Sequence, residues 1–247
     1  MDQTVQFRIY TRLLVAAAVL VALVSVPLVA GAAGSCPEGM ASLAAGSFKM
    51  GQRGDNATVA AFCLDVGPVT VEAYTACEKS GKCTAAVTSA GCNSAEGKRE
   101  KHPINCVNWS QAEAYCLSVG KELPTEEQLE WAARGGAKGT TYPWGNDAPS
   151  AQVCWNGEGN EQGKDKRTTT CPVASYPKGD SPEGIHDLAG NVWEWTSSKF
   201  EPESPARVYK GGSWGVDTAG LLEADTRFRV MPTFVYAYLG FRCAKNK

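Results

Sequence analysis

Apolar residues near the centre of the chain recur at helical spacing directly after residues that cap helices. Ser110 and Thr125 each stand three residues before a Glu or Gln, and side chains at that spacing bond each other's free backbone N–H groups. Because a glycine follows each run, we predict helices over 110–119 and 125–134. A third helix is predicted over 70–79, where apolar side chains fall on one face.

Elsewhere the apolar runs are short and are interrupted by Gly, Pro, Asn and Asp. Runs such as 47–51, 208–212 and 239–243 predict short strands separated by long loops. The stretches 94–101 and 156–170 are polar and are predicted to be loops. No internal repeat or break in composition divides the chain, so the pattern indicates one α+β domain with little regular secondary structure.

Charge excludes one large class of partner. The chain has 24 Lys and Arg against 26 Asp and Glu, and the two signs are interspersed. No basic face is therefore available to neutralise a row of phosphates, and we expect no nucleic-acid binding.

The N-terminus resembles an export signal. Arg8 and Arg12 precede an uncharged run over 13–33, and small residues follow near Ala32. This pattern predicts a secretory signal peptide over residues 1–32, cut after Ala32. The run is also long enough to stay as a membrane anchor, and it is the only expected membrane contact. The folded domain is predicted to cover 33–247 and to be exported, whether periplasmic, on the cell surface or secreted.

All ten cysteines follow this segment. An even number of cysteines behind an export signal indicates disulfides. A zinc site is disfavoured because the chain has no Cys-x-x-Cys pair and only two histidines, His102 and His186.

Several short segments resemble the motifs of one known family in their residues and in their order along the chain. They are 46–51, 102–105, 107–109, 112–116, 120–135, 142–146, 190–195, 210–214 and 240–243. Together they are similar to the formylglycine-generating enzyme (sulfatase-modifying factor) family. The resemblance covers almost all of 33–247 and implies that family's variant of the C-type-lectin-like α+β fold.

The resemblance also shows what this chain lacks. Active members use dioxygen and copper(I), held by two thiolates, to convert a cysteine in an unfolded sulfatase segment to formylglycine. Their two cysteines lie shortly after a Gly-Gly-Ser turn. Here Gly211-Gly212-Ser213 is followed by Val216 and Leu221 at those positions, and no cysteine occurs between Cys171 and Cys243. We therefore expect no copper, no catalytic residues and, on balance, no enzyme activity.

Calcium is the cofactor that the resemblance implies. One family site maps onto side-chain oxygens of Asp187 and Glu194 and main-chain carbonyls of Gly190 and Val192, a donor set suited to calcium. The alternative is a hydrogen-bonded turn in which Asp187 caps backbone N–H groups. A second family site begins with an Asn near 153–155, where this chain has Cys154 instead.

The resemblance implies one disulfide, Cys116–Cys243. For the others, proximity and parity favour Cys36–Cys63, Cys77–Cys83, Cys92–Cys106 and Cys154–Cys171, although sequence does not fix connectivity.

Three functions fit these observations. The first is a binding or scaffold module for a protein or peptide, with Ser213, Trp214, Arg227 and Arg229 gripping a peptide carbonyl or carboxylate. In the alternative interpretation, the two arginines only satisfy buried carbonyls or Asp225. The second function is a sulfatase-modifying oxidase that uses a copper site of another kind or no copper at all. The third is a calcium-dependent, lectin-like sugar binder.

Overall fold

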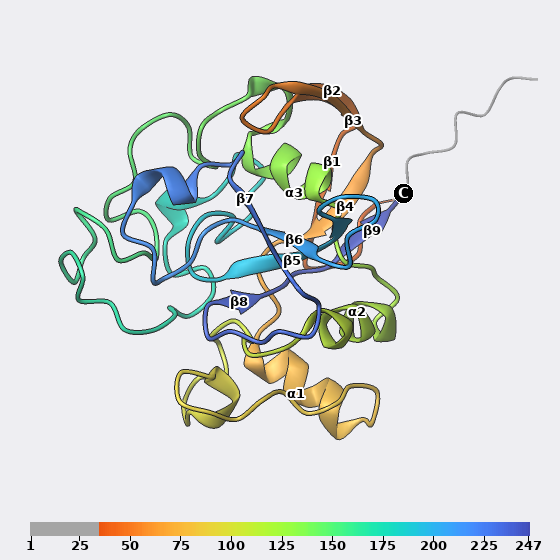
Figure 1. The fold of residues 1–247 in the computed structure, drawn as a ribbon, viewed down its shortest axis with the longest axis vertical. Helices are drawn as coiled ribbons and strands as arrows, with labels where there is room; N and C mark the ends of the chain where they lie inside the picture. The colour runs from red at the N-terminus through yellow and green to blue at the C-terminus, as the bar shows by residue number, and fades with distance from the viewer. Residues whose placement is uncertain (1–34) are drawn as a thin grey trace, which may run out of the picture. The chain divides into compact units, whose positions relative to one another are not determined.

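Residues 35–247 are described by the computed structural model, and their strands form small sheets (Figure 1). The first sheet joins both ends of this region, in the order β1 (Met40–Leu43), β4 (Phe62–Asp65), β9 (Ala244–Asn246). The second is a hairpin of β2 (Gly46–Met50) and β3 (Asp55–Val59). The third has the order β7 (Arg227–Val230), β6 (Arg207–Lys210), β5 (Trp193–Lys199), β8 (Leu239–Gly240). The predicted signal or anchor over 1–32 lies outside the described residues.

The three predicted helices are present. They are α1 (Val71–Lys79), α2 (Trp109–Ser118) and α3 (Glu126–Ala133). Thr125 and Gln128 cap α3 reciprocally, as predicted. The predicted cap of α2 was wrong, because the capping box is formed by Asn108 and Gln111 and the helix begins earlier than Ser110. Asn caps a helix as well as Ser does, and here the Asn108 side chain accepts the Gln111 N–H.

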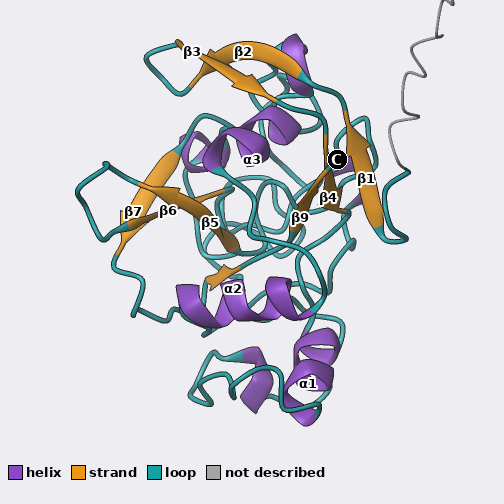
Figure 2. Ribbon diagram, turned by 90° about the vertical axis from the view of Figure 1, so that its right-hand side faces the viewer, coloured by secondary structure: helices purple, strands orange, loops and turns teal. Residues whose placement is uncertain are grey.

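Most of the remaining chain consists of loops, as Figure 2 shows. Helix α3 contacts both the β2–β3 hairpin and the β5–β6 strands, so it fills the space between these two sheets. Buried aromatic side chains pack the interior. Trp195 is fully buried and its indole N–H donates to the Val107 carbonyl at 3.1 Å, while Trp109 donates to the Thr196 carbonyl at 2.7 Å. These bonds satisfy the polar end of each indole within the core.

Five disulfides bind the loops to this core and join the same pairs as the sequence analysis proposed. They are Cys36–Cys63, Cys77–Cys83, Cys92–Cys106, Cys116–Cys243 and Cys154–Cys171. Cys116–Cys243 connects α2 to the residue before β9 across a sequence separation of 127. Within residues 35–247, no helix combines the length and the apolar character needed to cross a membrane.

Candidate functional site

An uncharged pocket of about 470 Å³ opens beside the Gly-Gly-Ser turn. Its walls come from β5, β6 and β7, from the turn itself, and from the 3₁₀ helix Ala219–Leu222. Ten residues line it: Asn156, Trp193, Tyr209, Ser213, Trp214, Gly215, Val216, Leu221, Phe228 and Tyr238. The aromatic rings form a continuous wall, since Trp193 packs edge-on against both Tyr209 and Phe228 with centroids 5.3 Å apart. Such a surface suits an apolar or aromatic side chain of a ligand.

The turn that carries Trp214 is fixed by its neighbours. Gly212 has φ 77°, and a Cβ there would lie 2.9 Å from the Leu221 carbonyl oxygen, so only glycine fits. The backbone N–H of Trp214 donates to the Asn191 carbonyl at 2.8 Å, and its indole N–H donates to the Ala237 carbonyl at 3.3 Å. The pocket is therefore formed before any ligand arrives, which lowers the entropy cost of binding.

Val216 and Leu221 both line this pocket, at the positions where the resemblance places the two thiolates of active enzymes. All ten cysteines of the chain are in disulfides, so none is free to bind a metal. Copper(I) prefers soft thiolate ligands, and an isopropyl and an isobutyl group offer no donor atom. The residues present do not fit the family's copper site.

Two of the lining residues, Tyr209 and Tyr238, are tyrosines. Burial and the neighbouring Tyr238 and Tyr236 raise the pKa of Tyr209 to about 12. The pKa of Tyr238 is also raised, by burial and then by Tyr236. Tyr236 and Tyr238 stack with ring centroids 4.8 Å apart. At neutral pH the phenols of Tyr209 and Tyr238 stay protonated, because the pKa of each is raised, so they offer O–H donors without adding charge.

A second pocket of about 570 Å³ adjoins the first and shares Leu221 and Phe228 with it. Unlike the first, it is charged. Its lining contains four carboxylates and two guanidiniums, from Asp55, Glu126, Glu201, Asp225, Arg53 and Arg227. The structure therefore separates the four residues that the sequence analysis grouped together. Ser213 and Trp214 line the first pocket, Arg227 lines the second, and Arg229 belongs to neither lining.

Both arginines already have partners. The Nε atom of Arg227 lies 3.0 Å from Oε1 of Glu126, an ion pair whose atoms are not aligned for a hydrogen bond. Arg227 also donates to the Phe200 carbonyl, and its guanidinium lies 4.4 Å from the centre of the Phe200 ring. Arg229 pairs with Glu201 at 3.7 Å and lies 4.3 Å from the same ring. Neither arginine forms an ion pair with Asp225 in the described part of the chain, and an incoming carboxylate would have to displace the pairs with Glu126 and Glu201.

Behind the second pocket lies a buried ion network that the sequence analysis missed. Lys210 lies 2.9 Å from Glu130 and 3.9 Å from Glu126, and it also donates to the Thr226 carbonyl. Burial raises the pKa of Glu126, an effect that Lys210 and Arg227 partly offset. Only the pair of acids four residues apart in the α3 sequence hinted at a shared cation; the lysine is 80 residues away.

Two of the four residues of the implied calcium site, Asp187 and Glu194, already accept hydrogen bonds through their carboxylates. Both oxygens of Glu194 accept hydrogen bonds of 2.7 Å from the buried guanidinium of Arg242. Oδ2 of Asp187 accepts from the Ala174 N–H at 2.9 Å, and burial raises the pKa of Asp187 to about 6. Asp187 has no ion pair within 35–247. Within the part of the chain that the structure describes, no group of three or more acidic, His or Cys side chains could hold a metal ion, and Glu194 is already neutralised by Arg242.

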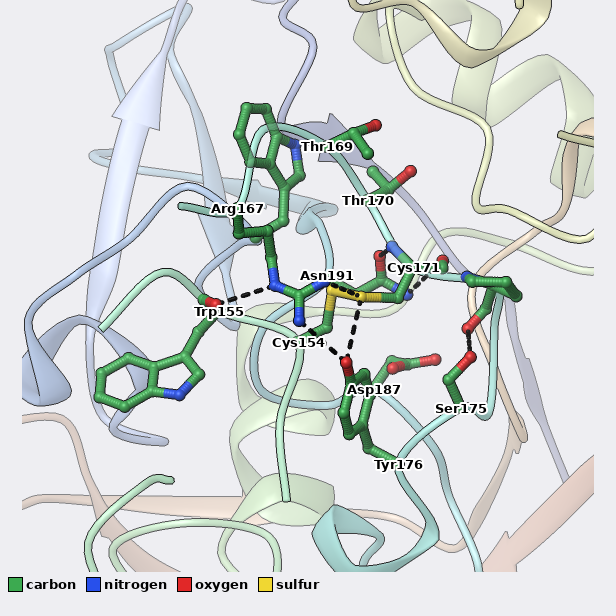
Figure 3. The surroundings of a disulfide bond; sticks show 12 residues. Cys154, Trp155, Arg167, Thr169, Thr170, Cys171, Ser175, Tyr176, Asp187 and Asn191 are labelled. Atoms are coloured by element: carbon green, nitrogen blue, oxygen red, sulfur yellow. Dashed lines mark hydrogen bonds between the residues drawn. A yellow bond between two sulfur atoms is a disulfide. The ribbon is translucent and has the colours of Figure 1, made fainter. Parts of the chain in front are cut away.

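A disulfide and an arginine stand where the second family calcium site would begin (Figure 3). Nη1 of Arg167 donates to Sγ of Cys171 at 2.7 Å, Nε donates to the Trp155 carbonyl at 2.9 Å, and Nη2 donates to the Tyr176 hydroxyl at 2.9 Å. Arg167 is buried. A guanidinium and a covalent bond thus hold this loop, which makes a cation there unfavourable.

The sequence profile of the family "Sulfatase-modifying factor enzyme 1-like domain" matches residues 27–247. The chain is 41% identical over 161 residues to the "Inactive C-alpha-formylglycine-generating enzyme 2" of Bos taurus, covering 61% of this chain and 53% of that protein. It is 37% identical over 172 residues to the "Formylglycine-generating enzyme" of Streptomyces coelicolor, covering 60% and 54%. The chain thus spans about half the length of these curated relatives.

Solved structures share the fold. PvdO from Pseudomonas aeruginosa superposes with a TM-score of 0.67 at 23% identity, covering 84% of this chain and 94% of that one. CarF superposes with a TM-score of 0.64 at 22% identity, covering 85% and 99%. The predicted α+β fold with few regular elements is confirmed.

Proposed function

Because the chain belongs to the sulfatase-modifying factor enzyme 1-like domain family, we propose that it is a non-catalytic member that binds an extended segment of a protein or peptide. The observation that carries the proposal is the first pocket. Val216 and Leu221 replace the thiolates, the lining is uncharged, and the pocket keeps its preformed aromatic wall. Such a pocket recognises a side chain but offers no group for redox chemistry.

The chemistry of the remaining cysteines supports this proposal. Five disulfides use all ten cysteines, so no thiol is available to exchange with a substrate cysteine. The same five disulfides support export, since such bonds persist in oxidising compartments such as the periplasm or the extracellular space.

The test begins with a peptide display library panned on the exported protein. Peptides enriched on the wild type are then titrated by calorimetry against the wild type and Trp214→Ala. We expect Trp214→Ala to weaken binding about tenfold or more while the circular dichroism spectrum is unchanged, because a buried aromatic contact anchors such interfaces. Phe234→Ala is the control, since Phe234 is 47% exposed and lines neither pocket. Equal affinities of Trp214→Ala and wild type would contradict the proposal.

The oxidase alternative is tested directly. The protein is incubated with copper(I), dioxygen and a cysteine-containing sulfatase peptide, and the products are examined by mass spectrometry. We expect no aldehyde-bearing product, because the pocket contains no thiolate. A turnover product that depends on this chain would establish a copper site elsewhere.

Calcium is a separate proposal, supported by the Asp187 carboxylate, which has no ion-pair partner within 35–247 although one of its oxygens accepts the Ala174 N–H, and by the carbonyls of Gly190 and Val192. In this arrangement the ion would tie together the loop that precedes β5. It would have a structural role, and it lends support to the lectin-like alternative only if sugar binding requires it.

A further inference from the structure

The Cys154–Cys171 disulfide differs from the other four in what touches its sulfur atoms (Figure 3). Nη1 of Arg167 donates to Sγ of Cys171 at 2.7 Å, and the Tyr176 hydroxyl lies 3.7 Å from the same sulfur. In the other disulfides of residues 35–247, the sulfur atoms that have a polar partner contact only serine hydroxyls or backbone carbonyls. Cys171 is therefore the one cystine of the described chain whose sulfur accepts a hydrogen bond from a cation.

Arg167 lacks a counter-charge. The residue is 5% exposed, and it forms no ion pair with any carboxylate of residues 35–247. Its two other hydrogen bonds go to the Trp155 carbonyl and the Tyr176 hydroxyl. A buried guanidinium without an anion is unfavourable, because the charge has lost its water and no opposite charge replaces it.

Reduction of the disulfide would supply the missing anion. Once the S–S bond is broken, Cys171 can remain a thiolate that accepts the existing bond from Arg167, and such charge-assisted bonds are stronger than neutral ones. A neighbouring cation favours the thiolate form of a cysteine. Because stabilising the reduced form makes a disulfide easier to reduce, the contact favours reduction of this disulfide over the others.

We infer that Cys154–Cys171 is a redox-active disulfide, which a dithiol reduces in the folded protein while the other four disulfides remain intact. A thiolate of the dithiol attacks Sγ of Cys154, the S–S bond breaks, and Cys171 leaves as the thiolate held by Arg167. The second sulfur of the reductant then bonds to the first and releases Cys154, which takes up one proton. The reductant loses two electrons and two protons, and the other proton goes to solvent.

Reduction would act on the first pocket through Asn191. The Asn191 side chain bonds the N–H and carbonyl of Cys171, and its backbone bonds the Cys154 carbonyl and the N–H of Trp214. When the S–S bond no longer closes the loop between the two cysteines, the segments that Asn191 holds together lose a covalent constraint. Resting on the proposed function, the reduced protein should therefore bind peptides more weakly, because the wall that carries Trp214 is less preorganised.

A redox titration in mixtures of reduced and oxidised dithiothreitol tests the inference. The protein is brought to equilibrium in each mixture, free thiols are trapped by alkylation, and peptide mass spectrometry reports each disulfide separately. Cys92–Cys106 is the internal control, because its sequence separation is 14 against 17 for Cys154–Cys171 and all four cysteines are buried. Its sulfur partner is the Ser89 hydroxyl, at 3.1 Å from Cys92, in place of a cation.

We expect the equilibrium constant for reduction of Cys154–Cys171 to exceed that of Cys92–Cys106 about tenfold or more, which corresponds to about 30 mV. Arg167→Gln keeps a hydrogen-bond donor without the charge and should abolish the difference, whereas Arg167→Lys should retain most of it. Lys166→Gln should change nothing. It is the matched control for loss of one positive charge from the same loop, because Lys166 is exposed.

Equal reduction of the two disulfides in the wild type would overturn the inference, and this comparison decides it even if Arg167→Gln does not fold. A difference that persists in folded Arg167→Gln would also overturn it. Failure of the proposed function is a separate result. If no display-selected peptide binds, the proposed function fails and the titration still decides whether the disulfide is redox-active. If peptides bind and reduction leaves their affinity unchanged, the link from the disulfide to the pocket is overturned.

Discussion

Replacing Lys210 by Met should be among the most damaging single changes in the chain. Lys210 is 3% exposed, and it is the ammonium that Glu130 and Glu126 share in the space behind the second pocket. Met has a similar length and no charge. The variant therefore keeps most of the packing and leaves two buried carboxylates short of a cation, with Arg134 and Arg227 as their remaining partners.

The expected cost is about 3–5 kcal/mol of unfolding free energy, the range for breaking a buried ion pair from one side. Urea denaturation with the disulfides intact, followed by tryptophan fluorescence, measures it. Arg53→Met is the control, because the Arg53–Asp55 pair is 86% and 68% exposed and such pairs contribute about 1 kcal/mol or less.

The pH dependence gives an independent check. The folded pKa of Glu126 is raised, chiefly by burial, so stability from this group is present at low pH and is lost as pH rises through its folded pKa. Removing Lys210 removes a charge that lowers this pKa, and the pKa in the variant rises further. The stability gap between Lys210→Met and wild type should therefore narrow as pH falls from 8 to 5. A gap below about 1 kcal/mol, or one independent of pH, would refute the reasoning.

Two further predictions concern the loops. Replacing Cys116 and Cys243 together by Ser should cost about 4–5 kcal/mol of unfolding free energy, because this disulfide closes a long loop in the unfolded chain. Urea denaturation of oxidised protein measures the loss. A loss smaller than that of the Cys77–Cys83 double variant would contradict the prediction, since that disulfide has a sequence separation of only 6. Calcium should raise the melting temperature of the wild type, EDTA should reverse the rise, and Asp187→Asn should abolish it; equal responses of both proteins would remove Asp187 from the calcium site.

Local signals predicted the local structure well. Thr125 and Gln128 marked the start of α3 because a capping box needs only residues three apart. The same reasoning misplaced the start of α2, where Asn108 and Ser110 are both acceptable caps and the tertiary fold selects between them. Sequence spacing also proposed the Cys154–Cys171 pair, because its two residues close a short polar loop.

Contacts between segments far apart in the sequence could not be predicted from such local signals. Lys210 meets Glu130 only after β6 packs beside α3, and no periodicity links a strand residue to a helix residue 80 positions earlier. The split of the groove was missed for the same reason. Ser213, Trp214, Arg227 and Arg229 follow one another closely in sequence, but in the structure both guanidiniums lie over the Phe200 ring and neither arginine lines the Trp214 pocket.

The stiffness of the groove follows from one buried amide. Asn191 is fully buried; its N–H donates to the Cys154 carbonyl, and its side chain bonds the N–H and carbonyl of Cys171. Its own carbonyl accepts the N–H of Trp214. The disulfide and the pocket wall are therefore joined through a single residue. If the pocket binds an extended peptide as proposed, these bonds hold its wall in place before the peptide arrives, and such preorganisation lowers the entropy cost of binding.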